Sequence, residues 1–271
     1  MPTGTIVEMR ILRLTTSDDF TSAIPEGAHA WEIAEATASA LIGEPVETVI
    51  KVIWPSPGIP GILERWLERY EPDLVFLTIS SYWFTYELLH RTIEEKLGPL
   101  APLVRPMREK VTTTEVVASS WPVRTARVAA SYVIDGKAHF TTAEVIDRVG
   151  ACMRLVLGRE QTLLVVRGPN NSFAANGSER AFRRADRRRQ TVEAAVSQQC
   201  AKLHVPYIAT RQSAEGSYRR PKAAYLADGL HNNLESHRQR GMSEGEVIAA
   251  AWCGSSAGTG RPSLGRVETA R

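Results

Sequence analysis

Short apolar runs rich in β-branched residues alternate along this chain with longer segments of helical period. Five runs have the length and composition of buried strands, namely residues 9–16, 46–54, 73–80, 161–168 and 205–210. The third run, DLVFLTIS, is apolar on both faces, as strands of parallel sheets are. Strands separated by helices at this spacing form βαβ units. The sequence therefore predicts an α/β fold, a three-layer α/β/α sandwich with a parallel sheet of about five strands.

The intervening segments define the helical layers and the extent of the domain. They predict helices at residues 29–43, 61–70, 84–98, 141–157, 180–203 and 243–252. Proline-punctuated residues 99–140 are expected to form an insertion over one end of the sheet. We expect a single domain over residues 1–252 and a disordered tail over residues 253–271, which lack periodicity.

Composition excludes several classes of protein. Cys152, Cys200 and Cys253 are odd in number and far apart, which argues against a disulfide framework and a zinc site and suits a cytoplasmic protein. No run approaches 18 apolar residues, and the first residues lack a long apolar run, so we expect neither a membrane span nor a signal peptide. The glycine-containing segments match no nucleotide-binding fingerprint, so we expect no cofactor and no metal.

An arginine-rich segment, SERAFRRADRRRQ (178–190), could suggest a nucleic-acid surface. Acidic Glu179 and Asp186 interrupt it, no aromatic residues are interleaved for base stacking, and the net charge of the chain is only +3. We therefore interpret the segment as a solvated helix face and expect no nucleic-acid partner.

Polar or glycine-containing segments follow four of the five predicted strands. Ser17 follows the first strand, Gly58 the second, SSYW (80–83) the third, and ADGLHNN (227–233) the fifth. Because active sites of parallel α/β sheets lie beyond the carboxyl ends of the strands, these segments should converge on one rim.

This order of segments resembles the SGNH/GDSL hydrolase family over roughly residues 9–252. The first block of that family is Gly-Asp-Ser, and here TTS (15–17) keeps only the serine; the fifth block, DGLH (228–231), is intact. The resemblance implies a flavodoxin-like topology and a catalytic triad. Ser17 would be the nucleophile, His231 its general base, and Asp228 the acid that orients the histidine.

The resemblance also implies an oxyanion hole, and here the sequence departs from the family. The backbone N–H groups of Ser17 and Gly58 would be donors. The third block is normally Gly-x-Asn-Asp, whose Asn side chain also donates, but at that position this chain has Tyr82. Loss of one such donor typically costs ~10²–10³ in rate, although a tyrosine hydroxyl could replace it.

Each of these residues also has a structural interpretation. Ser17 could be a turn residue, Asp228 a turn or helix-capping residue, and His231 a solvated loop residue. Gly58 could serve turn geometry alone, and Tyr82 could belong to the core. The other histidines, His29, His90, His139, His204 and His237, have no comparable setting.

The leading functional hypothesis is a serine esterase that cleaves a small carboxylic ester, a carbohydrate O-acetyl ester being one candidate. One alternative is a non-catalytic SGNH-like binding domain with an eroded oxyanion hole. Another is an O-acyltransferase that uses the same residues. The sequence leaves open the acyl group, the alcohol and the oligomeric state.

Overall fold

A parallel sheet of five strands organises the protein. The computed structural model describes residues 9–53, 57–85, 138–170, 179–209, 224, 226 and 231–259. The strands are β1 (Met9–Thr15), β2 (Val46–Val52), β3 (Leu74–Thr78), β4 (Leu163–Arg167) and β5 (Tyr207–Ile208), in the order β2-β1-β3-β4-β5. This confirms the predicted parallel α/β sheet, and the strand order is that of flavodoxin-like folds.

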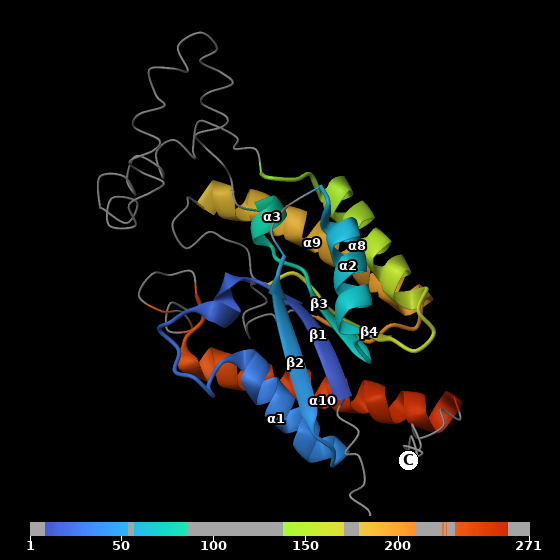
Figure 1. The fold of residues 1–271 in the computed structure, drawn as a ribbon. Helices are drawn as coiled ribbons and strands as arrows, with labels where there is room; N and C mark the ends of the chain where they lie inside the picture. The colour runs from blue at the N-terminus through green and yellow to red at the C-terminus, as the bar shows by residue number, and fades with distance from the viewer. Residues whose placement is uncertain are drawn as a thin grey trace, which may run out of the picture.

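Helices cover both faces of the sheet (Figure 1). One face carries α1 (Ala30–Ile42) and α10 (Leu234–Thr259), and the other carries α2 (Ile59–Tyr70), α8 (Thr142–Leu157) and α9 (Glu179–Lys202). Two short elements follow strands at their carboxyl ends, the 3-10 helix η1 (Ser17–Phe20) after β1 and α3 (Tyr82–Thr85) after β3. The result is the predicted three-layer sandwich.

Strand β1 is buried on both faces, as a central parallel strand must be. Leu12 and Leu14 belong to the core cluster that α2, α8 and α9 complete, whereas Ile11 belongs to the cluster completed by α1 and α10. Arg13 is only 2% exposed, and its guanidinium carbon lies 4.6 Å from the ring centroid of Phe76. A charged side chain in this position needs partners, and these are found at the end of the strand.

Local signals in the sequence place two helix ends correctly. Gly43 ends α1 in the left-handed region, with φ of 79°. Thr141 and Glu144 form the predicted capping box of α8, in which each side chain accepts a hydrogen bond from the backbone N–H of the other residue, at 2.8 and 3.2 Å.

Two glycines of α10 allow this helix to pack closely against α1. A Cβ atom on Gly241 would lie 2.6 Å from the carbonyl oxygen of Ala30, and one on Gly245 would lie 2.6 Å from Cβ of Thr37. Any larger residue would therefore force the two helices apart.

The structure corrects the predicted C-terminal helix. Instead of residues 243–252, α10 spans Leu234–Thr259. Residues 253–259 are therefore helical, although they were expected to belong to a disordered tail over residues 253–271. The amphipathic signal is missing from the first half of α10 because polar residues of that half face the protein interior. The fifth strand is also shorter than the predicted 205–210.

Some predictions fall outside the described residues. These are most of the helix expected at 84–98, most of the insertion expected at 99–140, and Asp228. Within the described part of the chain, no helix combines the length and the hydropathy that a membrane span requires.

Candidate active site

The segment of the predicted nucleophile follows β1 directly. Ser17 is the first residue of η1 and is exposed, so its hydroxyl is accessible to a ligand. In the sheet, β1 lies between β2 and β3. This order places Ser17 between the segment of Gly58, at the N-terminal cap of α2, and the segment of Tyr82, at the start of α3.

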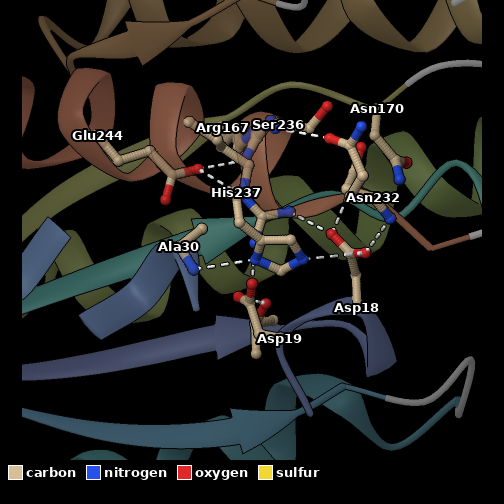
Figure 2. Close-up of polar contacts among 12 residues, drawn as sticks. Asp18, Asp19, Ala30, Arg167, Asn170, Asn232, Ser236, His237 and Glu244 are labelled. Atoms are coloured by element: carbon tan, nitrogen blue, oxygen red, sulfur yellow. Dashed lines mark hydrogen bonds and ion pairs between the residues drawn. The ribbon is translucent and has the colours of Figure 1, made fainter. Parts of the chain in front are cut away.

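Asp18 joins the Ser17 segment to the segment of the predicted base. One carboxylate oxygen of Asp18 accepts a hydrogen bond from the backbone N–H of Asn232 at 2.8 Å, and the other accepts from Nδ2 of Asn232 at 2.5 Å. Both side chains are buried, with 7% and 8% exposure. Since Asn232 directly follows His231, the residue after the predicted nucleophile holds the residue after the predicted base (Figure 2).

The backbone around His231 is fixed by two further hydrogen bonds. Its carbonyl oxygen accepts from the N–H of Leu226 at 2.8 Å, and the N–H of Asn233 donates to the carbonyl of Ala224 at 3.0 Å. These bonds join chain positions on either side of Asp228. His231 itself is half-buried.

Arg240 of α10 binds both acidic residues that follow Ser17. Its guanidinium donates from Nη1 to Asp18 and from Nη2 to Asp19. Asp19 also accepts from Nε of Arg13 at 3.2 Å and from the hydroxyl of Thr15 at 2.5 Å. Arg240, on the last helix of the described chain, thus bridges the two aspartates and holds the turn after β1.

Glu244, one turn further along α10, completes the cluster of charges. It accepts hydrogen bonds from Nη2 of Arg13 at 2.6 Å and from Nη1 of Arg167 at the end of β4, and it is fully buried. Burial alone would raise the pKa of Glu244, but the guanidinium groups of Arg13, Arg167 and Arg240 hold this pKa below its ordinary value.

We call the six side chains Arg13, Asp18, Asp19, Arg167, Arg240 and Glu244 the rim ion cluster. It contains three carboxylates and three guanidinium groups, so its charges balance. Burial would raise the pKa of Asp18, but Arg240, His237 and the backbone N–H of Asn232 hold it well below the ordinary value of 3.8. The carboxylates of Asp18 and Glu244 therefore remain ionised, as acceptors that position neighbouring segments.

His237 has a role that its sequence setting does not reveal. It is fully buried, and its Nδ1 accepts a hydrogen bond from the backbone N–H of Ala30 at 3.0 Å. Ala30 is the first residue of α1, so its N–H has no acceptor within the helix and needs this external partner. Nδ1 must therefore carry a lone pair, so the ring proton is on Nε2. Nε2 faces Oδ1 of Asp18 at 3.7 Å.

The third segment of the rim is tied to a loop after β4. Ser81 is fully buried, and its backbone N–H and its hydroxyl both donate to Oδ1 of Asn170, at 2.9 and 2.7 Å. The neighbouring Tyr82 is half-buried, packs against the core, and lies in a tilted contact with His139, with 5.3 Å between ring centroids.

Several residues of this rim were not predicted from the sequence. They are Arg13, Asp18, Asp19, Arg167, Asn170, Asn232, His237, Arg240 and Glu244. A usable signal was present on α10, where residues 237, 240 and 244 recur at the three- and four-residue spacing of one helix face. Among the residues that the structure describes, no group of three or more His, Cys, Asp or Glu side chains could hold a metal ion.

The arginine-rich segment is only partly the solvated face that was expected. Arg183 and Arg187 of α9 are exposed. Arg189, in contrast, is fully buried and binds Asp186 at 3.0 Å and Glu193.

Comparison with known proteins gives no match by sequence. No protein-family model matches the sequence. No curated protein matches it at the sequence level either.

Solved structures, however, match over nearly their whole length. The esterase EstA from Pseudoalteromonas sp. aligns with a TM-score of 0.51 and 10% identity, over 90% of this chain and 98% of that one. Est24, a carbohydrate acetylesterase from Sinorhizobium meliloti, aligns with a TM-score of 0.51 and 12% identity, over 89% and 99%. A protein assigned to the G-D-S-L lipolytic family from Desulfitobacterium hafniense DCB-2 aligns with a TM-score of 0.51 and 7% identity, over 88% and 99%. The chain therefore has the α/β sandwich fold found in esterases of the G-D-S-L type.

Proposed function

We propose that this protein is a serine esterase that hydrolyses short carboxylic esters with Ser17, His231 and Asp228. The observation that carries the proposal is the pair of hydrogen bonds between Asp18 and Asn232. They connect the residues that directly follow Ser17 and His231, which are 214 positions apart in the chain. A nucleophile and its base need this kind of fixed proximity.

The chemistry follows from the three side chains. The hydroxyl oxygen of Ser17 attacks the ester carbonyl carbon while His231 takes its proton. The tetrahedral intermediate then collapses, the alcohol leaves with the proton from His231, and the acyl group stays on Ser17. Water, deprotonated by His231, attacks the acyl-enzyme. The second tetrahedral intermediate collapses with cleavage of its bond to the Ser17 oxygen, which takes the proton back from His231, and the acid is released. Asp228 fixes the tautomer of His231 and stabilises its protonated form.

The developing negative charge on the carbonyl oxygen needs hydrogen-bond donors. We assign this task to the backbone N–H groups of Ser17, in the first turn of η1, and of Gly58, at the N-terminal cap of α2. The partial positive charge of a helix N-terminus favours an anion at such a place. Among short esters, carbohydrate O-acetyl esters are included because Est24, which shares the fold, is described as a carbohydrate acetylesterase.

Hydrolysis of 4-nitrophenyl acetate and butyrate tests this proposal. Ser17→Ala should abolish turnover, and an aryl phosphonate should add a phosphonyl group to wild type but not to Ser17→Ala, as read by mass spectrometry. Ser22→Ala is the matched control, because it removes another exposed serine hydroxyl close by and should leave both readouts unchanged. Equal turnover by wild type and Ser17→Ala would favour a non-catalytic binding domain.

A further inference from the structure

The carboxamide of Asn170 is oriented at the rim by a neighbouring segment. Its Oδ1 accepts both donors of the fully buried Ser81, the backbone N–H at 2.9 Å and the hydroxyl at 2.7 Å. A backbone N–H can only donate, so the atom that faces it must be the amide oxygen. The orientation of the carboxamide is thereby fixed, with its NH₂ group directed away from Ser81.

The NH₂ group of Asn170 bonds to no partner in the part of the chain that the structure describes. The two bonds to Ser81 hold the carboxamide in place, and Asn170 is half-buried, so part of the residue is open to solvent. A preoriented donor without a partner among the described residues is what stabilisation of a developing anion requires.

The backbone brings Asn170 from β4 towards β1. The N–H of Gly168 donates to the carbonyl of Ile208 at 2.9 Å, and a Cβ atom on Gly168 would overlap the hydroxyl group of Tyr207. Gly168 therefore leaves room for the Tyr207 side chain where the chain leaves β4. The chain then reaches Ser81, beyond the end of β3, the strand adjacent to β1.

Tyr82, the donor expected from the sequence, is committed elsewhere. Its ring packs against the core and lies in a tilted contact with His139. A tyrosine whose ring is packed in this way has little freedom to move its hydroxyl towards a substrate at Ser17.

We propose that Nδ2 of Asn170, and not the hydroxyl of Tyr82, is the side-chain donor to the oxyanion. This assignment rests on the proposed hydrolysis at Ser17. A loop after the fourth strand would thus supply the amide donor that the third segment of this chain lacks, and Ser81 would be the residue that positions it.

The test is Asn170→Asp, with kcat and KM measured separately on 4-nitrophenyl acetate. The aspartate keeps an oxygen for both Ser81 donors but replaces the NH₂ group by a second oxygen. We expect kcat to fall by about 10²–10³, the usual loss for one oxyanion donor, with KM nearly unchanged. Asn170→Ala, which adds no charge, should show the same loss in kcat, and Tyr82→Phe should keep its kcat.

Gln161→Glu is the matched control for added charge. It places a carboxylate on an exposed side chain just before β4, at the end of the sheet opposite the rim. As an added surface charge, it should change kcat less than about fivefold.

The outcomes separate this assignment from the proposed function. If wild type is active through Ser17 and both Asn170 variants keep their kcat, the assignment of Asn170 is wrong while the esterase proposal stands. If Tyr82→Phe alone loses kcat, the donor is Tyr82. If wild type shows no turnover that depends on Ser17, the esterase proposal fails and this assignment fails with it.

Discussion

The rim ion cluster makes a quantitative prediction for Asp18→Asn. The carboxylate of Asp18 accepts two hydrogen bonds from Asn232 and one from Arg240. An asparagine retains one acceptor oxygen, and its NH₂ group then faces the side-chain donors of Asn232 and Arg240. Arg240 also loses one of its three buried counter-charges, Asp18, Asp19 and Glu244.

The expected loss of stability follows from breaking a buried charge pair. Removal of one partner typically costs about 3–5 kcal/mol, because the other charge remains buried without full compensation. At about 2–4 °C for each kcal/mol in a protein of this size, the melting temperature should fall by roughly 6–20 °C. Asp147→Asn, on the exposed face of α8, is the matched control and should change stability by less than ~0.5 kcal/mol.

The effect should also depend on pH. The folded protein holds the pKa of Asp18 well below 3.8, so the carboxylate stabilises the fold fully at pH values above that number. As pH falls below 3.8 towards the folded pKa, the unfolded chain takes up the proton first and this stabilisation is lost. Urea unfolding at pH 7 and at pH 3 should therefore show a smaller difference between wild type and Asp18→Asn at the lower pH. Equal melting temperatures of wild type and Asp18→Asn at pH 7 would refute the view that the bonds of Asp18 to Asn232 and Arg240 stabilise the fold.

Three other outcomes are expected. Gly245→Ala should lower stability by about 1–3 kcal/mol in urea unfolding, because the new methyl group has no space between α10 and α1; unchanged stability would mean that the two helices can separate freely. In the native protein a thiol reagent should modify exposed Cys253 first, since burial raises the pKa of Cys152 to about 12 and that of Cys200 to about 11; rapid modification of all three thiols would contradict this. Asp228→Asn should keep its melting temperature but lose orders of magnitude in esterase rate, and a fully active variant would show that Asp228 does not orient the proposed base.

The sequence alone was sufficient for those elements whose signals are local. β3 is apolar on both faces, and Gly43 and Thr141 lie where a helix must end and begin. Each of these features can be identified within about one turn or one strand of sequence. The approximate number of strands and the three-layer arrangement follow from them.

The rim ion cluster could not be predicted in this way because its partners are far apart in the chain. Arg13 is charged in an otherwise apolar strand, and its partner Glu244 is 231 positions away. Asp18 and Asp19 are ordinary turn residues when only their neighbours in sequence are considered. The polar half of α10 is likewise typical of a solvated helix until the acidic residues after β1 are placed beside it.

The separation of these partners along the chain also has a consequence for synthesis. The acidic turn after β1 emerges from the ribosome early, whereas Arg240 and Glu244 are added more than 220 residues later. At the usual 5–20 residues per second, the interval is roughly 10–45 s. Throughout that time Arg13 lacks Glu244 and both aspartates lack Arg240, so part of their charge is uncompensated and opposes burial in a premature core. The packing around β1 should therefore be completed only after α10 emerges. Formation of the rim ion cluster would then be one of the last steps in the folding of a newly made chain.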